Sequence, residues 1–155
     1  MARHRPTNRF DLPTVGGKGV TTVGYVEMQK DVSGGGGPKS LLTLLERLDR
    51  SRYRPVVFCY GRGTLSDHLD RLGIAVEILE RNSRWSDFRI VAQIIRGLRR
   101  HDVDVLHVNT LDIRAGLAGA LSRRPFVGHL RVIFPTTWVD RWFAAMSDGI
   151  IGVSR

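Results

Sequence analysis

Short apolar runs alternate with helix-type patterns along most of this chain, and this alternation limits the folds that it can adopt. Strand-like runs lie at residues 21–28, 55–60, 75–79, 103–108, 125–130 and 149–153. Segments with apolar residues at helical spacing lie between them, at residues 40–50, 64–73, 86–101, 111–122 and 138–146. Strands and helices that alternate at this spacing form right-handed crossovers in a parallel sheet covered on both faces. The sequence therefore predicts an α/β fold, a Rossmann-like doubly wound parallel sheet.

Local signals support individual elements of this prediction. Residues 55–60, PVVFCY, form a continuous apolar run of the kind found in strands that are buried on both faces. Leu41, Leu44, Leu45 and Leu48 are spaced to form one apolar stripe on the helix predicted over residues 40–50.

The chain has 155 residues, enough for one domain with a hydrophobic core. Residues 1–19 show no periodicity and are predicted to be a disordered basic arm, and residues 20–155 form the domain. No apolar run approaches the roughly 20 residues needed to cross a bilayer, and the N-terminus lacks the apolar segment of a secretory signal. The single cysteine, Cys59, excludes an internal disulfide, so we expect a cytoplasmic protein.

The formal charge of +9 raises the question of an anionic partner. The arginines are scattered over most of the predicted helices, and no nucleic-acid-binding motif is visible, so the pattern does not favour nucleic acid. Anionic lipid or phosphorylated small molecules suit the charge better. Aromatic residues lie beside arginines in residues 84–89 (RWSDFR) and 136–143 (TTWVDRWF). They can rest on a membrane surface or belong to helix cores.

Four consecutive glycines, Gly34–Gly37, follow the first predicted strand directly before a helix. Such a loop lets backbone amides approach an anion, and the helix start adds free N–H groups and a positive dipole end. In a doubly wound sheet this turn lies in the ligand-binding crevice. The predicted phosphate-binding residues are Gly35, Gly36, Gly37 and Lys39. A plain turn without a ligand, with a solvated lysine, is the alternative.

Two common nucleotide motifs do not match this loop. A P-loop ends in Gly-Lys-Ser/Thr, whereas Pro38 separates Gly37 from Lys39 here. The Gly-x-Gly-x-x-Gly pattern of dinucleotide-binding domains also fails, because Ser40 and Leu41 follow where its third glycine is needed.

A second group of candidates follows the strand predicted over residues 103–108. Asn109 and Thr110 come where this strand opens into the crevice, and their side chains can bind the hydroxyls of a sugar or polyol, or cap the next helix. His107 alternates with Val108 inside a buried strand, so we expect it to be a hydrogen-bonded core histidine.

A third group ends the strand predicted over residues 125–130. His129 and Arg131 leave a buried strand toward the crevice, where such groups are costly unless they are paired or functional. An arginine suits a phosphate or carboxylate, and a pair with an acid such as Asp112 is the alternative. The histidines and Cys59 show no metal-ligand spacing, so no metal site is expected.

Several segments in order resemble the N-terminal half of the GT-B glycosyltransferases of family 4. They are SGGGGPKSLLTLLERL, LSDHLDRLGIAVEIL, LRRHDVDVLHVNT, RRPFVGHLR and SDGIIGVSR, and with the strand predicted before them they span residues 21–155. The resemblance implies two Rossmann-like domains facing across a cleft. The N-terminal domain binds the sugar acceptor, and the C-terminal domain binds the nucleotide-sugar donor.

The same resemblance implies a retaining transfer in which the donor diphosphate is the leaving group, with no further cofactor and no metal. It places Gly34–Gly37 in the cleft and the segment His129–Arg131 on the acceptor side. The acceptor class stays open among a lipid, a polysaccharide and a small polyol, and contact with an anionic membrane is compatible with it.

The resemblance is incomplete. The donor domain and the Glu-x7-Glu pair of the family are absent, and the position of the family's histidine falls closest to Arg131, so no catalytic residue is carried over. We expect a truncated, inactive acceptor-binding domain that needs a donor-binding domain or a partner chain. The alternatives are one subunit of a two-chain transferase and a non-catalytic module that binds phosphate or nucleotides.

Overall fold

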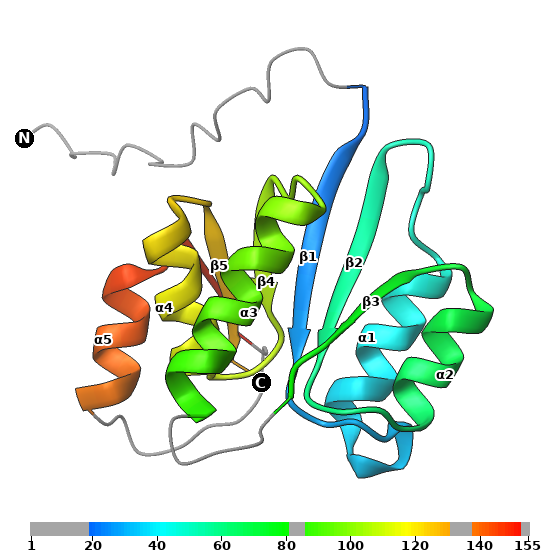
Figure 1. Ribbon diagram of the computed structural model, residues 1–155, viewed down its shortest axis with the longest axis horizontal. Helices are drawn as coiled ribbons and strands as arrows, with labels where there is room; N and C mark the ends of the chain where they lie inside the picture. The colour runs from blue at the N-terminus through cyan, green and yellow to red at the C-terminus, as the bar shows by residue number, and fades with distance from the viewer. Residues whose placement is uncertain (1–18, 81–85, 131–137, 153–155) are drawn as a thin grey trace, which may run out of the picture.

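The computed structural model describes residues 19–80, 86–130 and 138–152. Within these residues, six strands form one parallel sheet in the order β3-β2-β1-β4-β5-β6, with α-helices in the connections (Figure 1). The strands are β1 (Thr21–Glu27), β2 (Tyr53–Cys59), β3 (Ala75–Ile78), β4 (Val105–Val108), β5 (Phe126–Leu130) and β6 (Gly149–Gly152). The predicted Rossmann-like fold is confirmed. The predicted N-terminal arm lies outside the described residues, apart from Gly19.

The helices are α1 (Gly36–Glu46), α2 (Thr64–Arg71), α3 (Ser86–Arg100), α4 (Ile113–Ser122) and α5 (Trp138–Met146). A short 3-10 turn, η1 (Val32–Gly34), precedes α1. All predicted elements except α1 agree with the structure to within two residues at each end.

The helix predicted over residues 40–50 begins and ends four residues earlier than expected, at Gly36–Glu46. Gly35 is its N-cap residue, so Gly36 and Gly37 belong to its first turn rather than to the preceding loop. Pro38 is tolerated in that turn because its missing N–H would have no helical partner there. The backbone N–H groups at the start of α1 are therefore those of the glycine run itself.

The apolar stripe of α1 also differs from the prediction. Leu41, Leu42 and Leu45 are buried, whereas Leu44 is 43% exposed and Leu48 is half-buried beyond the helix end. The helix was expected to present Leu44 to the core, and it presents Leu42 instead.

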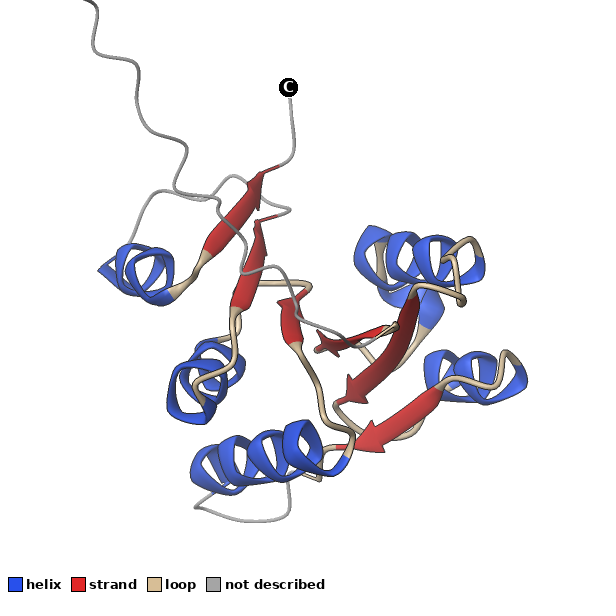
Figure 2. Cartoon of the chain, turned by 90° about the horizontal axis from the view of Figure 1, so that it is seen from above, coloured by secondary structure: helices blue, strands red, loops and turns tan. Residues whose placement is uncertain are grey.

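Each face of the sheet has its own hydrophobic core, because successive side chains of a strand point to opposite faces. Val26, Phe58 and Leu106 pack with residues of α3, α4 and α5. Tyr25 and Val57 pack on the other face with α1 and α2. Figure 2 shows the two helix groups on opposite sides of the strands.

The face that carries α1 and α2 is covered unevenly. Among the described helices, these two lie over β1–β3, and none lies over β4–β6 on that side (Figure 2). His107 and His129 point to this side and are half-buried, and Ile151 is 46% exposed. Leu106 and Phe126, which point to the other side, are buried. Among the described residues, no helix therefore covers the boundary between β1 and β4 beside α1.

Candidate functional site

The candidate site lies where β1 and β4 meet at the carboxyl ends of the strands. These strands are neighbours in the sheet, but the chain leaves β1 for α1 on one face and β4 for α4 on the other. Divergence of this kind opens a crevice, which is the usual ligand site of doubly wound sheets. The first turn of α1, with its glycines, borders the crevice.

Glu27, the last residue of β1, is fully buried in this crevice. Its carboxylate accepts a hydrogen bond from the backbone N–H of Gln29 at 3.0 Å and another from the side-chain amide of Asn109. The Asn109 amide also lies 3.4 Å from the Gly37 carbonyl oxygen. Glu27 and Asn109 therefore link β1, β4 and the first turn of α1.

Glu27 was not among the predicted site residues. The available signal was an acidic residue that directly follows Tyr25 and Val26 at the end of β1, TTVGYVE. A buried carboxylate there is retained only where hydrogen bonds compensate its desolvation. The structure supplies two such bonds.

Only one position of the glycine run, Gly37, borders this carboxylate. A Cβ atom added to Gly37 would lie 3.5 Å from Glu27 Oε2, whereas one added to Gly36 would meet no atom within 4 Å. Gly35 has φ of 152°, a conformation that favours glycine. Lys39 is exposed on α1. The structure thus joins Gly37 to Asn109 and leaves Gly36 and Lys39 facing open space.

Thr110 and His129 complete the predicted set on this edge. The hydroxyl of Thr110 is buried and has no hydrogen-bond partner among the described residues. The rings of His129 and His107 stack with centroids 5.5 Å apart, and the rings of Tyr25 and His107 form a T-shaped pair with centroids 5.2 Å apart. His107 was expected in the core, but it belongs to this half-buried stack because no described helix covers β4 there. Arg131 lies outside the described residues.

Asp112, which was considered only as a partner of Arg131, caps α4 instead. It is the N-cap residue of α4 and accepts a hydrogen bond from the Arg114 backbone N–H at 3.0 Å, so the helix-capping alternative for Asn109 and Thr110 is wrong. Its side chain also accepts bonds from Tyr60 at 2.5 Å and from the Arg114 guanidinium at 3.0 Å. The acid named as an alternative partner for Arg131 thus already accepts three hydrogen bonds.

The Tyr60–Asp112–Arg114 cluster is partly withdrawn from water. Burial, followed by the charge of Asp112 and the hydrogen bond with it, raises the pKa of Tyr60 above its ordinary range. Burial disfavours the charge of Arg114, but its hydrogen bond with Asp112 and the charge of that carboxylate outweigh this effect and raise the pKa. Tyr60 therefore stays neutral and Arg114 stays charged at neutral pH, and the two side chains with Asp112 form one wall of the carboxyl edge.

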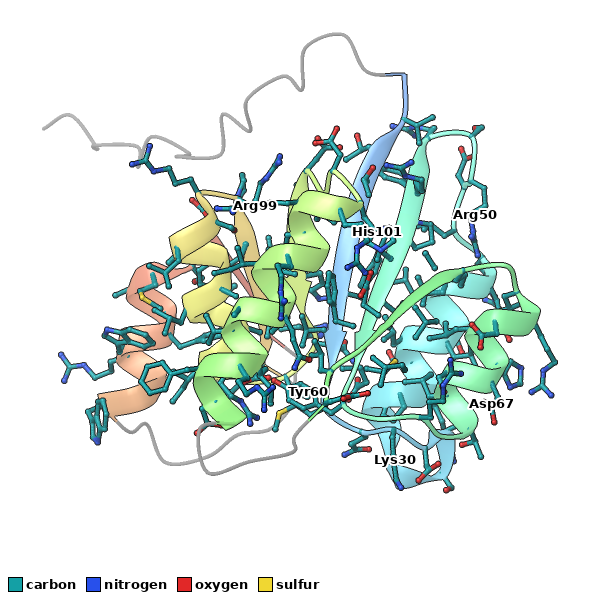
Figure 3. All side chains as sticks on the ribbon, viewed as in Figure 1. Lys30, Arg50, Tyr60, Asp67, Arg99 and His101 are labelled. Carbon is teal, nitrogen blue, oxygen red and sulfur yellow. The ribbon has the colours of Figure 1, made fainter. Side chains whose placement is uncertain are left out.

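A hollow of about 870 Å³ opens beside this wall at the carboxyl edge. It is lined by residues that include Lys30, Tyr60, Arg62, Glu80 and Arg114. Figure 3 shows the labelled Lys30 and Tyr60 at this end of the molecule.

A second hollow, of about 670 Å³, lies at the opposite edge near His101 (Figure 3). Its polar groups are bonded to one another, since Arg54 donates to the Thr22 hydroxyl at 3.0 Å and to the His101 carbonyl at 2.8 Å. The carboxyl edge is therefore the better candidate.

The segment between β1 and α1 is anchored to the start of α2. Asp31 Oδ1 accepts a hydrogen bond from the Thr64 N–H at 3.0 Å, and the Thr64 hydroxyl accepts one from the Val32 N–H at 3.0 Å. The Lys30 carbonyl accepts a bond from the Leu65 N–H at 3.0 Å. These bonds fix the glycine run relative to the crevice.

Neither metal ligation nor thiol chemistry is indicated in the part of the chain that the structure describes. No group of three histidine, cysteine, aspartate or glutamate side chains converges there in a way that could hold a metal ion. Burial, with smaller effects of the Glu27 and Asp70 charges, raises the pKa of Cys59 to about 12. The thiol is therefore protonated at neutral pH and is a poor nucleophile. Within the described residues, no helix is long and apolar enough to span a membrane.

Comparisons with solved structures show the same fold in several proteins. The chain is similar to HepE from Anabaena, crystallised with UDP-glucose, at 18% identity and a TM-score of 0.64, over 83% of this chain and 36% of that one. It is similar to a glycosyltransferase from Rickettsia africae at 18% identity and a TM-score of 0.67, over 88% of this chain and 38% of that one. It is similar to MurG from Acinetobacter baumannii at 12% identity and a TM-score of 0.68, over 85% of this chain and 41% of that one.

The chain thus spans well under half the length of these structures. No curated protein sequence matches it significantly. The family model for glycosyltransferase family 4, however, matches residues 34–155, from the glycine run through β6. The chain belongs to glycosyltransferase family 4 and has the Rossmann-like fold of an N-terminal GT-B domain.

Proposed function

We propose that this chain is the acceptor-binding half of a retaining glycosyltransferase that uses a nucleotide-sugar donor. Family membership supports glycosyl transfer as the reaction. The complex of the similar HepE with UDP-glucose supports a nucleotide sugar as the donor. Because the chain spans only 36–41% of the similar structures, a second domain or a partner chain would bind the donor.

The observation that carries this proposal is the buried Glu27–Asn109 pair beneath the glycine run. Both side chains are fully buried, so they act by holding the first turn of α1 in place, and the exposed Gly36 and Lys39 are the groups that a ligand would meet there. The Thr110 hydroxyl, which has no partner among the described residues, offers a further bond at the same edge. A bare phosphate beside Glu27 would be repelled, whereas the start of α1 and Lys39 favour one farther out. The site therefore suits an acceptor with hydroxyls and an anionic group, such as a polyol phosphate.

In the proposed transfer, an acceptor hydroxyl oxygen forms a bond to the anomeric carbon of the donor sugar as the bond to the donor diphosphate breaks. The hydroxyl proton leaves with the diphosphate. Glu27 and Asn109 would hold the first turn of α1 in place and thereby fix the position of an acceptor bound against it. Without the donor-binding half, the isolated chain is expected to bind acceptor but to transfer no sugar.

The test is the melting temperature of the chain in the presence of polyol phosphates, neutral polyols, inorganic phosphate, free nucleotides and nucleotide sugars. A ligand that binds only the folded state raises this temperature by mass action. At a ligand concentration of 100 times its Kd, the free energy of unfolding rises by about 2.7 kcal/mol. Polyol phosphates are expected to give the largest rise. Gly36→Ala places a methyl group in the open space and is expected to abolish the rise without lowering the melting temperature of the free chain.

Two results would contradict this proposal. If free nucleotides stabilised the chain most strongly, it would be a nucleotide-binding module rather than an acceptor domain. If Gly36→Ala left the response to polyol phosphates unchanged, the ligand would not lie at the glycine run.

A further inference from the structure

The hollow of about 670 Å³ lies at the amino edge of the sheet, at the opposite end of the strands from the candidate crevice. Its lining includes residues from the starts of three neighbouring strands, Thr22 of β1, Tyr53 of β2 and Ala75 of β3. Arg50 and His101, which also line it, are labelled in the upper half of Figure 3. We call it the amino-edge hollow. Its volume is in the usual range of pockets for small molecules, about 300–1,000 Å³.

Two arginines bring positive charge to this hollow. Arg50 donates a hydrogen bond to the Leu45 carbonyl oxygen at 3.2 Å. Arg54 donates to the Thr22 hydroxyl at 3.0 Å and to the His101 carbonyl oxygen at 2.8 Å. All three acceptors are neutral oxygen atoms. Neither guanidinium group has an ion pair with a carboxylate of the described residues, so both charges are left uncompensated.

The acids close to the hollow are bound to other cations. Asp102, the one acid among the described residues that line it, lies 3.5 Å from the Arg124 guanidinium. The Glu77 carboxylate lies 2.7 Å from the His101 ring and accepts a hydrogen bond from Arg100 at 2.9 Å. These pairs leave the two arginine charges to dominate the hollow, so it favours an anion.

The guanidinium groups also keep N–H groups that a ligand can use. Arg54 uses its Nε and Nη2 atoms in three hydrogen bonds, and its Nη1 atom has no acceptor among the described residues. Arg50 uses only its Nη2 atom. Because its hydrogen bonds already hold Arg54 in place, an anion that binds it loses little free energy to the ordering of this side chain. Arginine binds carboxylate and phosphate groups through such N–H groups.

The surroundings favour a carboxylate over a phosphate. The helices α1 and α3 end at this edge, at Glu46 and Arg100, so the negative ends of their dipoles lie here. A phosphate with two charges is repelled about twice as strongly as a carboxylate with one. The free backbone N–H groups of helix starts, which favour phosphate, lie at the other edge of the sheet.

We propose that the amino-edge hollow binds a small carboxylate that carries an apolar body. Arg50 and Arg54 bind the carboxylate group. The apolar body packs against Val20, Pro55 and Ala75, which line the same hollow. This site is separate from the candidate crevice, and the inference goes beyond the proposed transfer reaction and does not depend on it.

The experiment follows backbone amide NMR shifts of the full chain on titration with phenylacetate and with its uncharged isostere phenylacetamide. Phenylacetate is expected to bind with a Kd of about 1 mM, since it has only about ten non-hydrogen atoms. Phenylacetamide is expected to bind at least about tenfold more weakly, because it lacks the charge that the arginines bind. Phenylacetate is expected to shift the amides of Thr22, Ala75 and His101 and to leave Gly35–Gly37 unperturbed.

The chain offers a matched pair of arginine variants. Arg50→Gln is expected to weaken phenylacetate binding about tenfold, because it removes a charged donor from the hollow. Arg47→Gln removes the same charge from the same end of α1, but Arg47 is exposed and lies outside the lining of the hollow. It is expected to keep wild-type affinity. Ala75→Leu fills the hollow without touching either arginine and is expected to abolish binding. Circular dichroism melting curves establish that each variant is folded.

Four results would overturn this proposal. Phenylacetate at about 10 mM, ten times the expected Kd, gives no shifts, which would mean that the arginines serve only the ends of α1 and α3. Phenylacetamide binds as tightly as phenylacetate. Arg50→Gln and Arg47→Gln have equal affinities. The shifts fall at the glycine run instead of the amino edge.

The response of the melting temperature to polyol phosphates is expected to be the same for Arg50→Gln and wild type. Failure of this proposal is therefore distinguishable from failure of the proposed function.

Discussion

Replacing Asn109 with aspartate is expected to lower the free energy of unfolding by about 3 kcal/mol at pH 8, because it sets a second carboxylate against the buried Glu27. In the native chain the Asn109 amide donates to Glu27 and lies 3.4 Å from the Gly37 carbonyl oxygen. Asn109→Asp replaces that donor with an acceptor that faces two other acceptors. The change in shape is small, so the effect reports the electrostatics of the crevice.

The loss should depend on pH in a defined direction. Repulsion raises the pKa of the new carboxyl group in the folded state above its unfolded value of about 3.9, so the folded state binds the extra proton more tightly. The variant therefore gains stability as pH falls through the folded-state pKa, by up to about 1.4 kcal/mol per pH unit, until the unfolded-state pKa is reached. Urea unfolding between pH 5 and pH 8 measures this slope.

Asn109→Ala is the control for this prediction. It removes the same donor without adding a charge, so it is expected to cost about 2 kcal/mol with a pH dependence like that of wild type. Equal pH profiles for the aspartate and alanine variants would show that Glu27 is not a buried carboxylate partner of Asn109.

Gly63→Ala is expected to lower the free energy of unfolding by about 3 kcal/mol, as overpacking in a rigid contact does. A Cβ atom at Gly63 would lie 2.5 Å from the Lys30 carbonyl oxygen and 2.7 Å from Asp31 Oδ1. The first of these atoms belongs to the backbone of the segment that leads to the glycine run, so it cannot rotate away. Gly63 itself has φ of −176°, extended backbone that any residue adopts, so the cost is steric.

The matched control is Gly36→Ala, because an added Cβ atom there meets nothing within 4 Å. Its effect on stability is expected to stay within about 0.5 kcal/mol. Urea denaturation followed by circular dichroism compares the two variants. A Gly63→Ala variant as stable as Gly36→Ala would mean that the segment before α1 is not held against α2 as described.

Most of the fold could be predicted from the sequence because the relevant signals are local. Apolar runs such as residues 55–60 and helical spacing such as that of residues 138–146 predict their elements from a few neighbouring residues. The start of α1 was misplaced because Gly36 and Gly37 have low intrinsic helix propensity, and tertiary packing of Leu41, Leu42 and Leu45 overrides it.

The site was predictable only in part, because its central contact joins distant parts of the sequence. Gly37 and Asn109 were each predicted from the residues around them, but their meeting through Glu27 depends on the pairing of β1 with β4. A lone glutamate at a strand end has no local signature that distinguishes a buried carboxylate from a solvated one. The stack of His107 on His129 was hidden for a similar reason, since which part of a sheet lacks a helix is a property of the whole topology.

The most direct test of the acceptor-binding account is a map of backbone amide NMR shifts on titration with a polyol phosphate that raises the melting temperature. The account predicts that the perturbed amides cluster at Gly35–Gly37, Asn109–Thr110 and His129, and that free UDP leaves them unperturbed. Shifts confined to the hollow at the opposite edge, around Thr22 and His101, or stronger shifts of the glycine run with UDP than with the polyol phosphate, would contradict it.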